Sequence, residues 1–533
     1  MEPQQQVAWG STSLGIELGS TRIKAVLVDA SGTLLAVGGH DWENQWIDQN
    51  WTYSLDDAWS GVRAAYADLV ADVRRRHGVQ LTSVGSLGIS GMMHGYLPFD
   101  ADGELLVPFR TWRNTSTSAA ATQLSERLRY AIPQRWSVAH LYQAVLDAEP
   151  HVPRIARLTT LAGYVHSRLS GEHILGVGEA SGMFPIDVAT GSFDTAMLAA
   201  FDELVVGHGF TWRLADLLPA VLPAGREGGR LSEEGALLLD PSGTLQAGVL
   251  MAPPEGDAGT GMVATNSVRP RTANVSAGTS IFAMVVLERP LHRPHPELDL
   301  VTTPAGDLVA MVHCNNGASE LNAWAAVFGD FARRIGTDAD ASAIFGALFG
   351  AALDAEPDAG GLLAYNYLSG EHNVGLEQGR PLFVRTPDST FSLANFVRAQ
   401  WYAMLATLRI GMAPLADEHV QIDSFFGHGG VFRTPGVGER LLAAALNVPV
   451  SVGEAAAEGG AWGMAVLAGF AASRDDDLDL PDYLSTRIFT DARLRTVNPE
   501  PRDVAGFDEF LNRFDAGMAI ERTAIDHLPS ASG

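Results

Sequence analysis

A strand–turn–strand pattern near the N-terminus occurs again about half a chain later and limits the folds open to this sequence. LGIELGSTRIKAVLVDASGTLLAVGGHDW, residues 14–42, has apolar, β-branched runs separated by a GST turn at 19–21 and by ASG. This pattern predicts three strands in a meander with two tight turns. TANVSAGTSIFAMVVLERP, residues 272–290, repeats it around GTS at 278–280. The offset from 19 to 278 is 259 residues, close to half of the 533, and hints at two related halves.

The rest of the chain predicts an α/β architecture. Residues 55–76 carry apolar side chains at three- and four-residue spacing, which predicts a helix. SVGSLGIS, residues 83–90, has the composition of a buried strand and leads into the glycine-flanked loop 91–100. A third glycine loop, FFGHGGVFRTP at 425–435, precedes another predicted helix. Strand, helix and strand in this order are typical of α/β folds.

The net charge of the chain argues against some classes of binding partner. The chain has 62 acidic and 36 basic side chains, which gives a formal net charge of −26. Affinity for nucleic acid or for an anionic membrane depends on a basic face, so neither is expected as a partner. Cys314 is the only cysteine, which excludes an intrachain disulfide and a zinc site built from cysteines. Lys24 is the only lysine in the chain.

The expected location is the cytoplasm. The N-terminus, MEPQQQVAWGSTS, has no basic segment that leads into an apolar one, so a secretory signal is not expected. No run approaches the roughly 18 uncharged apolar residues that a membrane-spanning helix needs. We therefore expect a soluble protein.

The two small-residue turns suit phosphate binding. Glycine lets phosphate oxygens approach the backbone, several N–H groups converge in such a turn, and the hydroxyl side chains add donors. Arg22 follows the first turn and is suited to a phosphate that is being transferred. Taken singly, each turn is better explained as an ordinary hairpin; two turns together with the GHGG loop favour a nucleoside triphosphate, which needs several anchor points. None of these loops is of the Walker type.

Three further residues are candidates for chemistry. Glu17 lies in the apolar first strand, where a buried charge needs a partner such as Mg²⁺ bound through water; an edge-strand glutamate that faces solvent is the alternative. Asp257, in EGDAGTGM, is either a helix N-cap or a general base that takes a proton from a substrate hydroxyl. His94, in a glycine-bounded loop, is either a ligand-binding residue or a satisfied donor.

Taken in order, the segments of this chain resemble the FGGY carbohydrate kinases, members of the actin-like ATPase superfamily. The resemblance covers roughly residues 13–472 and rests on six segments in the family's order. They are IELGSTRIKAVLVDASG (first phosphate segment), ISGMMHGYLPFDADGELLVPFRTWRNTST (sugar site), LSGEHILGVGEASGMFPIDVATGSFD, LLPAVLPAGREGGRLSEE with EGDAGTGM (approach to the catalytic aspartate), SAGTS (second phosphate segment), and FFGHGGVFRTP with EAAAEGGAWGMAVLAG (adenosine segment).

The resemblance implies two actin-like, ribonuclease H-like domains, each a mixed β-sheet flanked by helices, with a cleft between them. The expected domains are an N-terminal kinase domain at 1–265, a C-terminal kinase domain at 266–475 and an acidic helical extension at 476–533. The implied activity is ATP-dependent phosphorylation of a sugar hydroxyl in the cleft, with ATP and Mg²⁺ as cofactors. A homodimer is one assembly open to such a protein.

The resemblance also assigns roles to residues. Asp257 takes the place of the catalytic base at the substrate hydroxyl, and Glu17 takes the position associated with the metal ion. The residues implied at the sugar are Met93, His94, Trp112 and Asn114. The residues implied at ATP are Ser20, Thr21 and Arg22 at the γ-phosphate, Gly278, Thr279 and Ser280 at the β- and γ-phosphates, and Gly427, Gly429, Gly430, Gly460 and Ala461 at the adenosine.

Several positions depart from the family pattern. Glu17 and Glu179 each replace an aspartate, Asn114 stands where an aspartate is common, and Met92 replaces a glutamine. In addition, Ala258 follows the catalytic aspartate where many relatives carry Asn or Gln. Three of these changes lie in or near the expected sugar site, so they bear on substrate identity more than on the kinase chemistry.

The expected substrate is a ketopentose, with D-xylulose ahead of L-ribulose or another ketose or polyol. Met93-His94-Gly95 favours the xylulokinase branch of the family, whereas the length of 533 residues is nearer the ribulokinase branch. The alternative from another class is an actin-like sensor or assembly protein that only binds sugar or ATP. Retention of Asp257 argues against this alternative, because binding alone needs no base.

Overall fold

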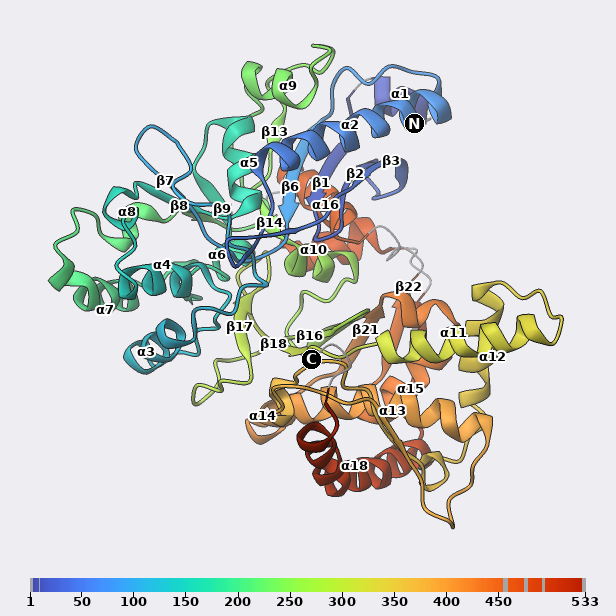
Figure 1. Cartoon of the computed structure of the whole chain (residues 1–533). Coiled ribbons are helices and arrows are strands. Elements are labelled where there is room, and N and C mark those ends of the chain that lie inside the picture. Colours follow the sequence, from blue (N-terminus) through green and yellow to red (C-terminus); the bar gives the residue numbers. More distant parts are fainter. Residues whose placement is uncertain (1–2, 9, 454–458, 474–477, 491–493, 530–533) are drawn as a thin grey trace. The chain divides into compact units, whose positions relative to one another are not determined.

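The computed structural model describes residues 3–8, 10–453, 459–473, 478–490 and 494–529. The chain divides into two compact units (Figure 1). The first unit comprises Met1–Arg269, Asp299–Val309 and Glu458–Asp491, and the second comprises Pro270–Leu298, Ala310–Ala457 and Ala492–Gly533. Each unit is built on a mixed β-sheet with flanking helices.

The central sheet of the first unit combines strands from the N-terminal part of the chain with two short strands within residues 250–256. Its sheet consists of β1 (Ser13–Leu18), β2 (Arg22–Val28), β3 (Leu34–Asp41), β6 (Ser86–Gly91), β13 (Leu250–Met251) and β14 (Glu255–Gly256). The strand order is β13-β6-β1-β2-β3, with β14 also paired to β6. β1, β2 and β3 are successively antiparallel, so the predicted meander is confirmed. β6 is parallel to β1, and β13 and β14 are parallel to β6.

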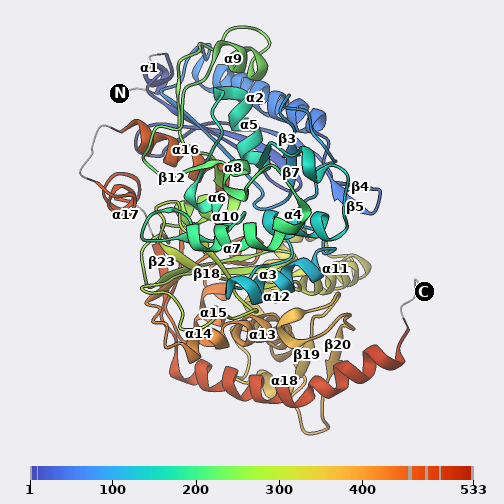
Figure 2. The ribbon, with the colours of Figure 1, turned by 90° about the vertical axis from the view of Figure 1, so that its left-hand side faces the viewer.

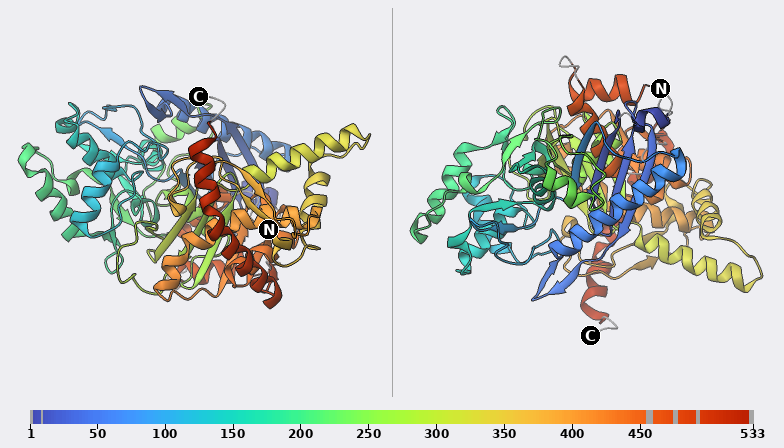
Figure 3. Two further views of the ribbon diagram at one scale, coloured as in Figure 1. Left: turned by 60° about the horizontal axis from the view of Figure 1, so that its bottom comes forward. Right: turned by 90° about the horizontal axis from the view of Figure 1, so that it is seen from above.

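Two helices, α2 (Leu55–His77) and α16 (Gly459–Ala472), cover opposite faces of this sheet (Figures 1 and 3). A Cβ atom at Gly15 would overlap the backbone of α16, and one at Gly38 would overlap the backbone of α2. In the strand register Gly15 is level with Val37, the residue before Gly38, so the two glycines face opposite sides of the sheet. Glycine at these positions lets each helix lie directly on a strand.

The ends of α2 follow from its sequence. The hydroxyl of Ser54 accepts a hydrogen bond from the N–H of Asp57, 2.9 Å away, and so caps the first turn. Gly78 adopts a φ of 69°, the left-handed conformation that ends many helices, and its N–H donates to the carbonyl of Arg74. The helix expected at 55–76 is therefore confirmed.

Apart from the short helices α1 (Pro3–Ala8) and α17 (Leu480–Tyr483), the other described α-helices of the first unit lie in the chain between β6 and β14 or directly after β14. They are α3 (Ser118–Leu128), α4 (Ser137–Leu146), α5 (Leu161–Ser170), α6 (Val177–Ala180), α7 (Thr195–Val205), α8 (Leu214–Leu217), α9 (Glu233–Leu239) and α10 (Asp257–Ala264). α5 contacts β6 and α10 contacts α16, so both belong to the layers around the central sheet.

The second unit repeats the central hairpin. Its sheet includes β15 (Thr272–Ala277), β16 (Ile281–Val286), β18 (Leu308–Cys314), β21 (Ser424–His428), β22 (Val450–Gly453) and β23 (Leu494–Val497), in the order β18-β16-β15-β21-β22-β23. β15 is antiparallel to β16 and parallel to β21, and β21 is parallel to β22. The larger helices are α11 (Ser319–Arg334), α12 (Ala341–Ala352), α13 (Leu393–Gly411), α15 (Val437–Leu446) and α18 (Pro501–His527).

The two sheets share one arrangement of their central strands. In each, a hairpin (β1–β2 or β15–β16) is joined by a strand parallel to its first member (β6 or β21), which in turn has a further parallel neighbour (β13 or β22). The two hairpins that the sequence places 259 residues apart are therefore the same element of two similarly built sheets.

The units are not the consecutive segments that the sequence predicts. The helix α16 lies between β22 and β23 of the second sheet in the chain but packs on β1 in the first unit, because its glycines and alanines let it approach that strand closely. The predicted extension at 476–533 is likewise divided: its described residues up to 490 belong to the first unit, and those from 494 onward belong to the second.

β23 and α18, near the C-terminus, pack into the second unit. β23 pairs antiparallel with β22, and α18 contacts α13 and α15 (Figure 2). The helix buries Phe507, Phe510 and Phe514 completely, and the ring of Phe507 meets that of Tyr402 in α13 at a centroid distance of 4.9 Å. Within the described part of the chain, no helix combines the length and the apolar character needed to cross a membrane.

Candidate active site

Three predicted site segments of the first unit follow the carboxyl ends of parallel strands. The turn 19–21 follows β1, the loop 92–95 follows β6, and Asp257 follows β14. In the register Leu18 is level with Gly91, and so is Gly256. The three segments therefore meet at one edge of the sheet, the edge where ligands of α/β proteins bind.

Asp257 is the first residue of α10 and directs its carboxylate toward the loop after β6. Its Oδ1 accepts hydrogen bonds from the N–H groups of Met93, 3.3 Å away, and of Ala258, 3.0 Å away. Burial raises the pKa of Asp257 to about 6, against the effect of these two donors. Its side chain keeps a partly exposed surface. Gly256, and not Asp257, is the N-cap of α10, so the N-cap interpretation of Asp257 is wrong.

Glu17 lies in β1 close to Asp257. Because β1 is flanked by β6 and β2, the edge-strand interpretation of Glu17 is wrong. Its Oε2 accepts the N–H of Ala461 at 3.2 Å, and Lys24 stands directly opposite it across the β1–β2 pair. Burial and the neighbouring charge of Asp257 raise the pKa of Glu17 to about 7, while Lys24 and the Ala461 N–H act in the opposite direction. The side chain is partly exposed.

Two more carboxyl groups lie fully buried behind this pair. Glu255 accepts hydrogen bonds from the N–H groups of Gly178 (3.3 Å) and Glu179 (2.9 Å) at the start of α6, and burial raises its pKa to about 8. Burial, with the charges of Asp257 and Glu255, raises the pKa of Glu179 well above its usual range. Neither oxygen of Glu179 makes a hydrogen bond of normal geometry within the described part of the chain, although the Thr160 hydroxyl is near enough to lower its pKa.

The acidic residues at this edge suit a metal ion that arrives with a phosphate group. Among the described residues, no group of three or more His, Cys, Asp or Glu side chains is arranged to hold a metal ion. Mg²⁺ keeps several waters and is commonly held by one or two carboxylates together with substrate phosphates. The partly exposed carboxylate of Glu17, with one backbone donor, fits such a water-mediated role.

His94 is a buried, neutral histidine. Its Nδ1 lies 3.1 Å from the carbonyl oxygen of Gly182, a hydrogen bond that requires the proton on Nδ1. Burial, and then the charge of Arg135, lower its pKa to about 3. Its φ of 70° places it in the left-handed region, which costs a non-glycine residue about 1 kcal/mol. These contacts make His94 a satisfied donor and leave its predicted role at the sugar as a prediction.

The predicted sugar residues Trp112 and Asn114 lie in a separate group of contacts. The side chain of Asn114 bonds to the backbone of Trp51 through both its carbonyl oxygen (2.8 Å) and its amide (2.9 Å), and the amide also donates to the carbonyl of Thr111. Trp112 is half-buried and packs against the core of the first unit, with the Arg113 guanidinium 6.0 Å from its ring. The structure thus gives Asn114 a structural partner, and its role toward a sugar stays a prediction.

The turn 19–21, which is predicted to bind phosphate, is held by two stacked aromatic rings. The carbonyl of Gly19 accepts from the indole N–H of Trp42 (2.7 Å), and the carbonyl of Ser20 accepts from the hydroxyl of Tyr53 (2.6 Å). The two rings lie 4.2 Å apart, centroid to centroid. Thr21 and Arg22 are exposed, and Arg22 pairs with Asp41 at 3.1 Å.

The second unit brings two predicted nucleotide segments together. The turn 278–280 follows β15, and the loop at Gly429 and Gly430 follows the parallel strand β21, where Ser276 is level with His428. Gly429 has a φ of 105°, and a Cβ there would overlap the carbonyl of Ala277. A Cβ at Gly430 would meet nothing within 4 Å, so this glycine is open to a ligand.

The other predicted adenosine residues have packing partners. A Cβ at Gly427 would lie 2.6 Å from the ring of Phe432. Gly460 and Ala461 belong to the first unit, at the start of α16. A Cβ at Gly460 would overlap Oε1 of Glu17, so these two residues are next to the predicted metal-associated residue. Their role at the adenosine stays a prediction.

Sequence reasoning missed the residues that surround the two partly exposed carboxylates. These are Ser90 and Thr260, whose hydroxyls lie 3.2 Å apart beside Gly256, together with Glu255 and Lys24. The acidic residue two positions before Asp257 was visible in the sequence and could have been singled out. The hydroxyl pair could not, because its members are 170 residues apart.

Comparison with known proteins identifies the family of the chain. The N-terminal domain of the FGGY family of carbohydrate kinases matches residues 12–240, and its C-terminal domain matches residues 273–472. Xylulose kinase of Escherichia coli (strain K12) is 25% identical over 289 residues, which make up 53% of this chain and 55% of that protein. Xylulose kinase of Streptomyces rubiginosus is 24% identical over 293 residues, which make up 53% of this chain and 56% of that protein. The matched region thus spans about half the length of these relatives.

Solved structures match nearly the whole chain. The crystal structure of xylulose kinase from Rhodospirillum rubrum has a TM-score of 0.76 at 20% identity and covers 96% of this chain and 98% of its own. The crystal structure of Plasmodium falciparum glycerol kinase with ADP has a TM-score of 0.72 at 12% identity, and the match covers 94% of this chain and 98% of that chain. These similarities confirm the expected two-domain actin-like fold. With both domains of the family matched in order, the protein belongs to the FGGY family of carbohydrate kinases.

Proposed function

We propose that this protein transfers the γ-phosphate of ATP to a hydroxyl group of a ketopentose, with D-xylulose as the favoured substrate. The observation that carries the proposal is the state of Asp257. Its carboxylate is partly exposed at the carboxyl ends of parallel strands, is oriented by two backbone N–H groups, and has a pKa raised to about 6. A general base works best when its pKa lies near the working pH.

In the proposed reaction Asp257 accepts the proton of the attacking hydroxyl group. The sugar oxygen then forms a bond to the γ-phosphorus, while the bond from that phosphorus to the β,γ-bridging oxygen breaks and ADP leaves with the electron pair. The products are a sugar phosphate, ADP and the proton on Asp257, which solvent removes. Such a reaction depends on position and charge more than on covalent catalysis.

The two small-residue turns supply the proposed contacts to ATP. Ser20, Thr21 and Arg22 would contact the γ-phosphate, and the turn 278–280 the β- and γ-phosphates. Mg²⁺ would neutralise phosphate charge when bound, with Glu17 as its water-mediated carboxylate. The open position of Gly430 supports an approach of the nucleotide to the loop after β21. The roles of Gly427, Gly429, Gly460 and Ala461 at the adenosine belong to the same proposal.

The choice of substrate rests on two kinds of support. Met93-His94-Gly95 has the pattern of the xylulokinase branch, and curated relatives and solved structures that match this chain are named xylulose kinases. L-ribulose is the second choice. The cytoplasmic location and the homodimer stay predictions from the sequence.

The test is sugar-dependent formation of ADP and of sugar phosphate by the purified protein with Mg²⁺ and ATP. The panel contains D-xylulose, L-ribulose, other ketoses and polyols, with a sample without sugar as the control for plain ATP hydrolysis. We expect phosphate transfer to a ketopentose at a rate well above that control. Binding of sugar and ATP without turnover on any substrate of the panel would favour the sensor and contradict the proposal.

A further inference from the structure

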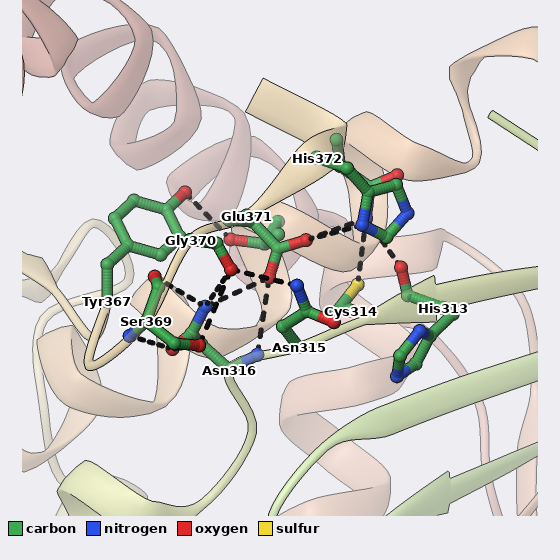
Figure 4. A network of polar contacts seen from close by, with 11 residues as sticks. His313, Cys314, Asn315, Asn316, Tyr367, Ser369, Gly370, Glu371 and His372 are labelled. Carbon is green, nitrogen blue, oxygen red and sulfur yellow. Dashed lines mark hydrogen bonds and ion pairs between the residues drawn. The ribbon is translucent and has the colours of Figure 1, made fainter. Parts of the chain in front are cut away.

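A buried network in the second unit centres on Glu371, which none of the site predictions includes (Figure 4). Glu371 is completely buried. Its Oε2 accepts both the backbone N–H of Asn316 (3.2 Å) and the side-chain amide of Asn316 (3.1 Å), while Oε1 accepts the amide of Asn373 (3.1 Å). Both oxygens of the carboxylate are therefore used as acceptors of hydrogen bonds.

Asn316 is fixed from its other side as well. Its Oδ1 accepts the N–H groups of Leu368 (2.9 Å) and Ser369 (3.1 Å). Its backbone carbonyl accepts the amide of Asn366, which also donates to the carbonyl of Gly317. Together, these hydrogen bonds of Asn316 and Asn366 hold the loop 316–318, between β18 and α11, in one backbone position.

That loop is bonded directly to the second phosphate turn. The N–H of Gly317 donates to the carbonyl of Thr279 and the N–H of Ala318 donates to the carbonyl of Gly278, both at 2.8 Å. A Cβ at Gly317 would lie 2.5 Å from the carbonyl oxygen of Gly278, so the two segments are in close contact.

These two bonds fix which way the turn presents its donors. A trans peptide is planar, and its carbonyl and the following N–H point in opposite directions. Because loop 316–318 binds the carbonyls of Gly278 and Thr279, the N–H groups of Thr279 and Ser280 point away from it. Successive N–H groups directed to one side of a turn form an anion-binding concavity.

We infer that Glu371 and Asn316 are positioning residues for the nucleotide: through loop 316–318 they orient the peptide groups of the turn 278–280 toward the ATP phosphates. The inference rests on the proposed function, because it assumes that this turn binds phosphate. Neither side chain needs to touch ATP.

The first test is Glu371→Gln, with ATP affinity measured by calorimetry on the full chain and D-xylulose affinity measured in parallel. In either orientation the glutamine amide places its NH₂ against a donor, the one on Asn316 or the one on Asn373. We expect ATP to bind about tenfold more weakly, the effect of losing one buried hydrogen bond, with sugar affinity within about twofold of the parent. Removing the donor on the other side should relieve the conflict, so Glu371→Gln with Asn373→Ala is expected to regain most of the ATP affinity.

The matched control is Glu521→Gln. Glu521 is also fully buried in the second unit and also accepts a backbone N–H, that of Arg380 at 2.7 Å, but it lies in α18. We expect this variant to bind ATP as the parent does, even if its thermal stability falls.

The outcomes separate the inference from the proposed function. A parent protein that binds no ATP contradicts the proposed function. A parent that binds ATP, together with a folded Glu371→Gln variant of parental ATP affinity, contradicts only the inference. If Glu371→Gln does not fold, Gly317→Ala decides, since its added Cβ presses on the carbonyl of Gly278: parental ATP affinity in that variant overturns the inference, and weaker binding with unchanged sugar affinity supports it.

Discussion

The backbone N–H of Met93 donates a hydrogen bond to Oδ1 of Asp257 across 3.3 Å, although the two residues are 164 positions apart in the sequence. The bond ties the first residue of α10 to the loop that follows β6. It holds the carboxylate in one orientation, and the proposed function assigns the second oxygen to a substrate hydroxyl.

The catalytic rate should depend on pH through Asp257. Its pKa is raised to about 6, and only the ionised carboxylate accepts a proton. We therefore expect kcat/KM for the sugar to be level above about pH 7 and to fall about tenfold per pH unit well below pH 6. The measurement is initial rate against pH, with sugar phosphate detected directly so that no coupling enzyme adds its own pH dependence. A profile that stays flat from pH 5 to pH 8 would contradict the assignment.

Replacing Glu179 by glutamine should alter stability in a pH-dependent way. Burial raises the folded-state pKa of Glu179 well above the unfolded value near 4.5, so above that pH the unfolded chain releases a proton that the folded chain keeps. Stability of the parent is thereby lost as pH rises through this window, by at most about 1.4 kcal/mol per pH unit. Glu179→Gln does not titrate, so its midpoint of thermal unfolding should rise relative to the parent between pH 5 and pH 8.

The comparison at pH 5 is the internal control for that experiment. There the buried carboxyl of the parent is protonated and similar in shape to the glutamine amide, so the two proteins should unfold at nearly the same temperature. A constant difference at every pH would show that Glu179 does not titrate in this way.

A methyl group at Gly460 should disturb the carboxylate of Glu17, which the proposed function places at the metal ion. The added Cβ would overlap Oε1 of Glu17 and lie 2.7 Å from the hydroxyl of Thr260, so Glu17 must move. We expect Gly460→Ala to lower kcat at least about tenfold and to raise the Mg²⁺ concentration for half-maximal activity.

The matched substitution is Gly350→Ala in α12, where the new Cβ would meet nothing within 4 Å. Alanine in an open helical position stabilises the helix by about 0.5–1 kcal/mol and should leave kcat and the Mg²⁺ requirement unchanged. Equal activity of Gly460→Ala and Gly350→Ala would argue against a role for Glu17.

Asn114→Asp should destabilise the first unit. The amide of Asn114 donates to the carbonyls of Trp51 and Thr111, and a carboxylate oxygen in its place would face two acceptors. We expect a loss of about 2 kcal/mol in the free energy of unfolding, measured by denaturant titration. Asn498→Asp, at an exposed position, adds the same charge and should change stability by less than about 0.5 kcal/mol.

Much of the fold was readable from the sequence because the decisive elements are local. The hairpin around 19–21, its repeat around 278–280 and the helix at 55–76 each depend on residues that are adjacent or a few positions apart, and the structure confirms all three. The placement of α16 was not readable. It depends on the close packing of small residues of α16 against Gly15 in β1, more than 440 residues away in the sequence. A local sequence pattern does not predict a contact over such a separation.

The same contrast applies to the site. Glu17 stood out because a charge in an apolar strand is conspicuous in a sequence, and Asp257 stood out because it lies where a turn leads into a predicted helix. The sequence does not predict which hydrogen-bond partners the other polar side chains have. Asn114 has the residue type of a sugar ligand, yet its amide is bound to the backbone of Trp51. Asn316 is part of an unremarkable HCNNGAS segment, and only the fold brings Glu371 to it.

The most direct test of the central claim is the rate of sugar-dependent phosphate transfer by Asp257→Asn relative to the parent. Asparagine keeps the size of the side chain and an oxygen for the N–H of Met93, but it cannot take a proton. We predict a kcat at least about 100-fold below that of the parent, with affinities for sugar and ATP within a few-fold of the parental values. Parental turnover by Asp257→Asn would contradict the assignment of Asp257 as the base.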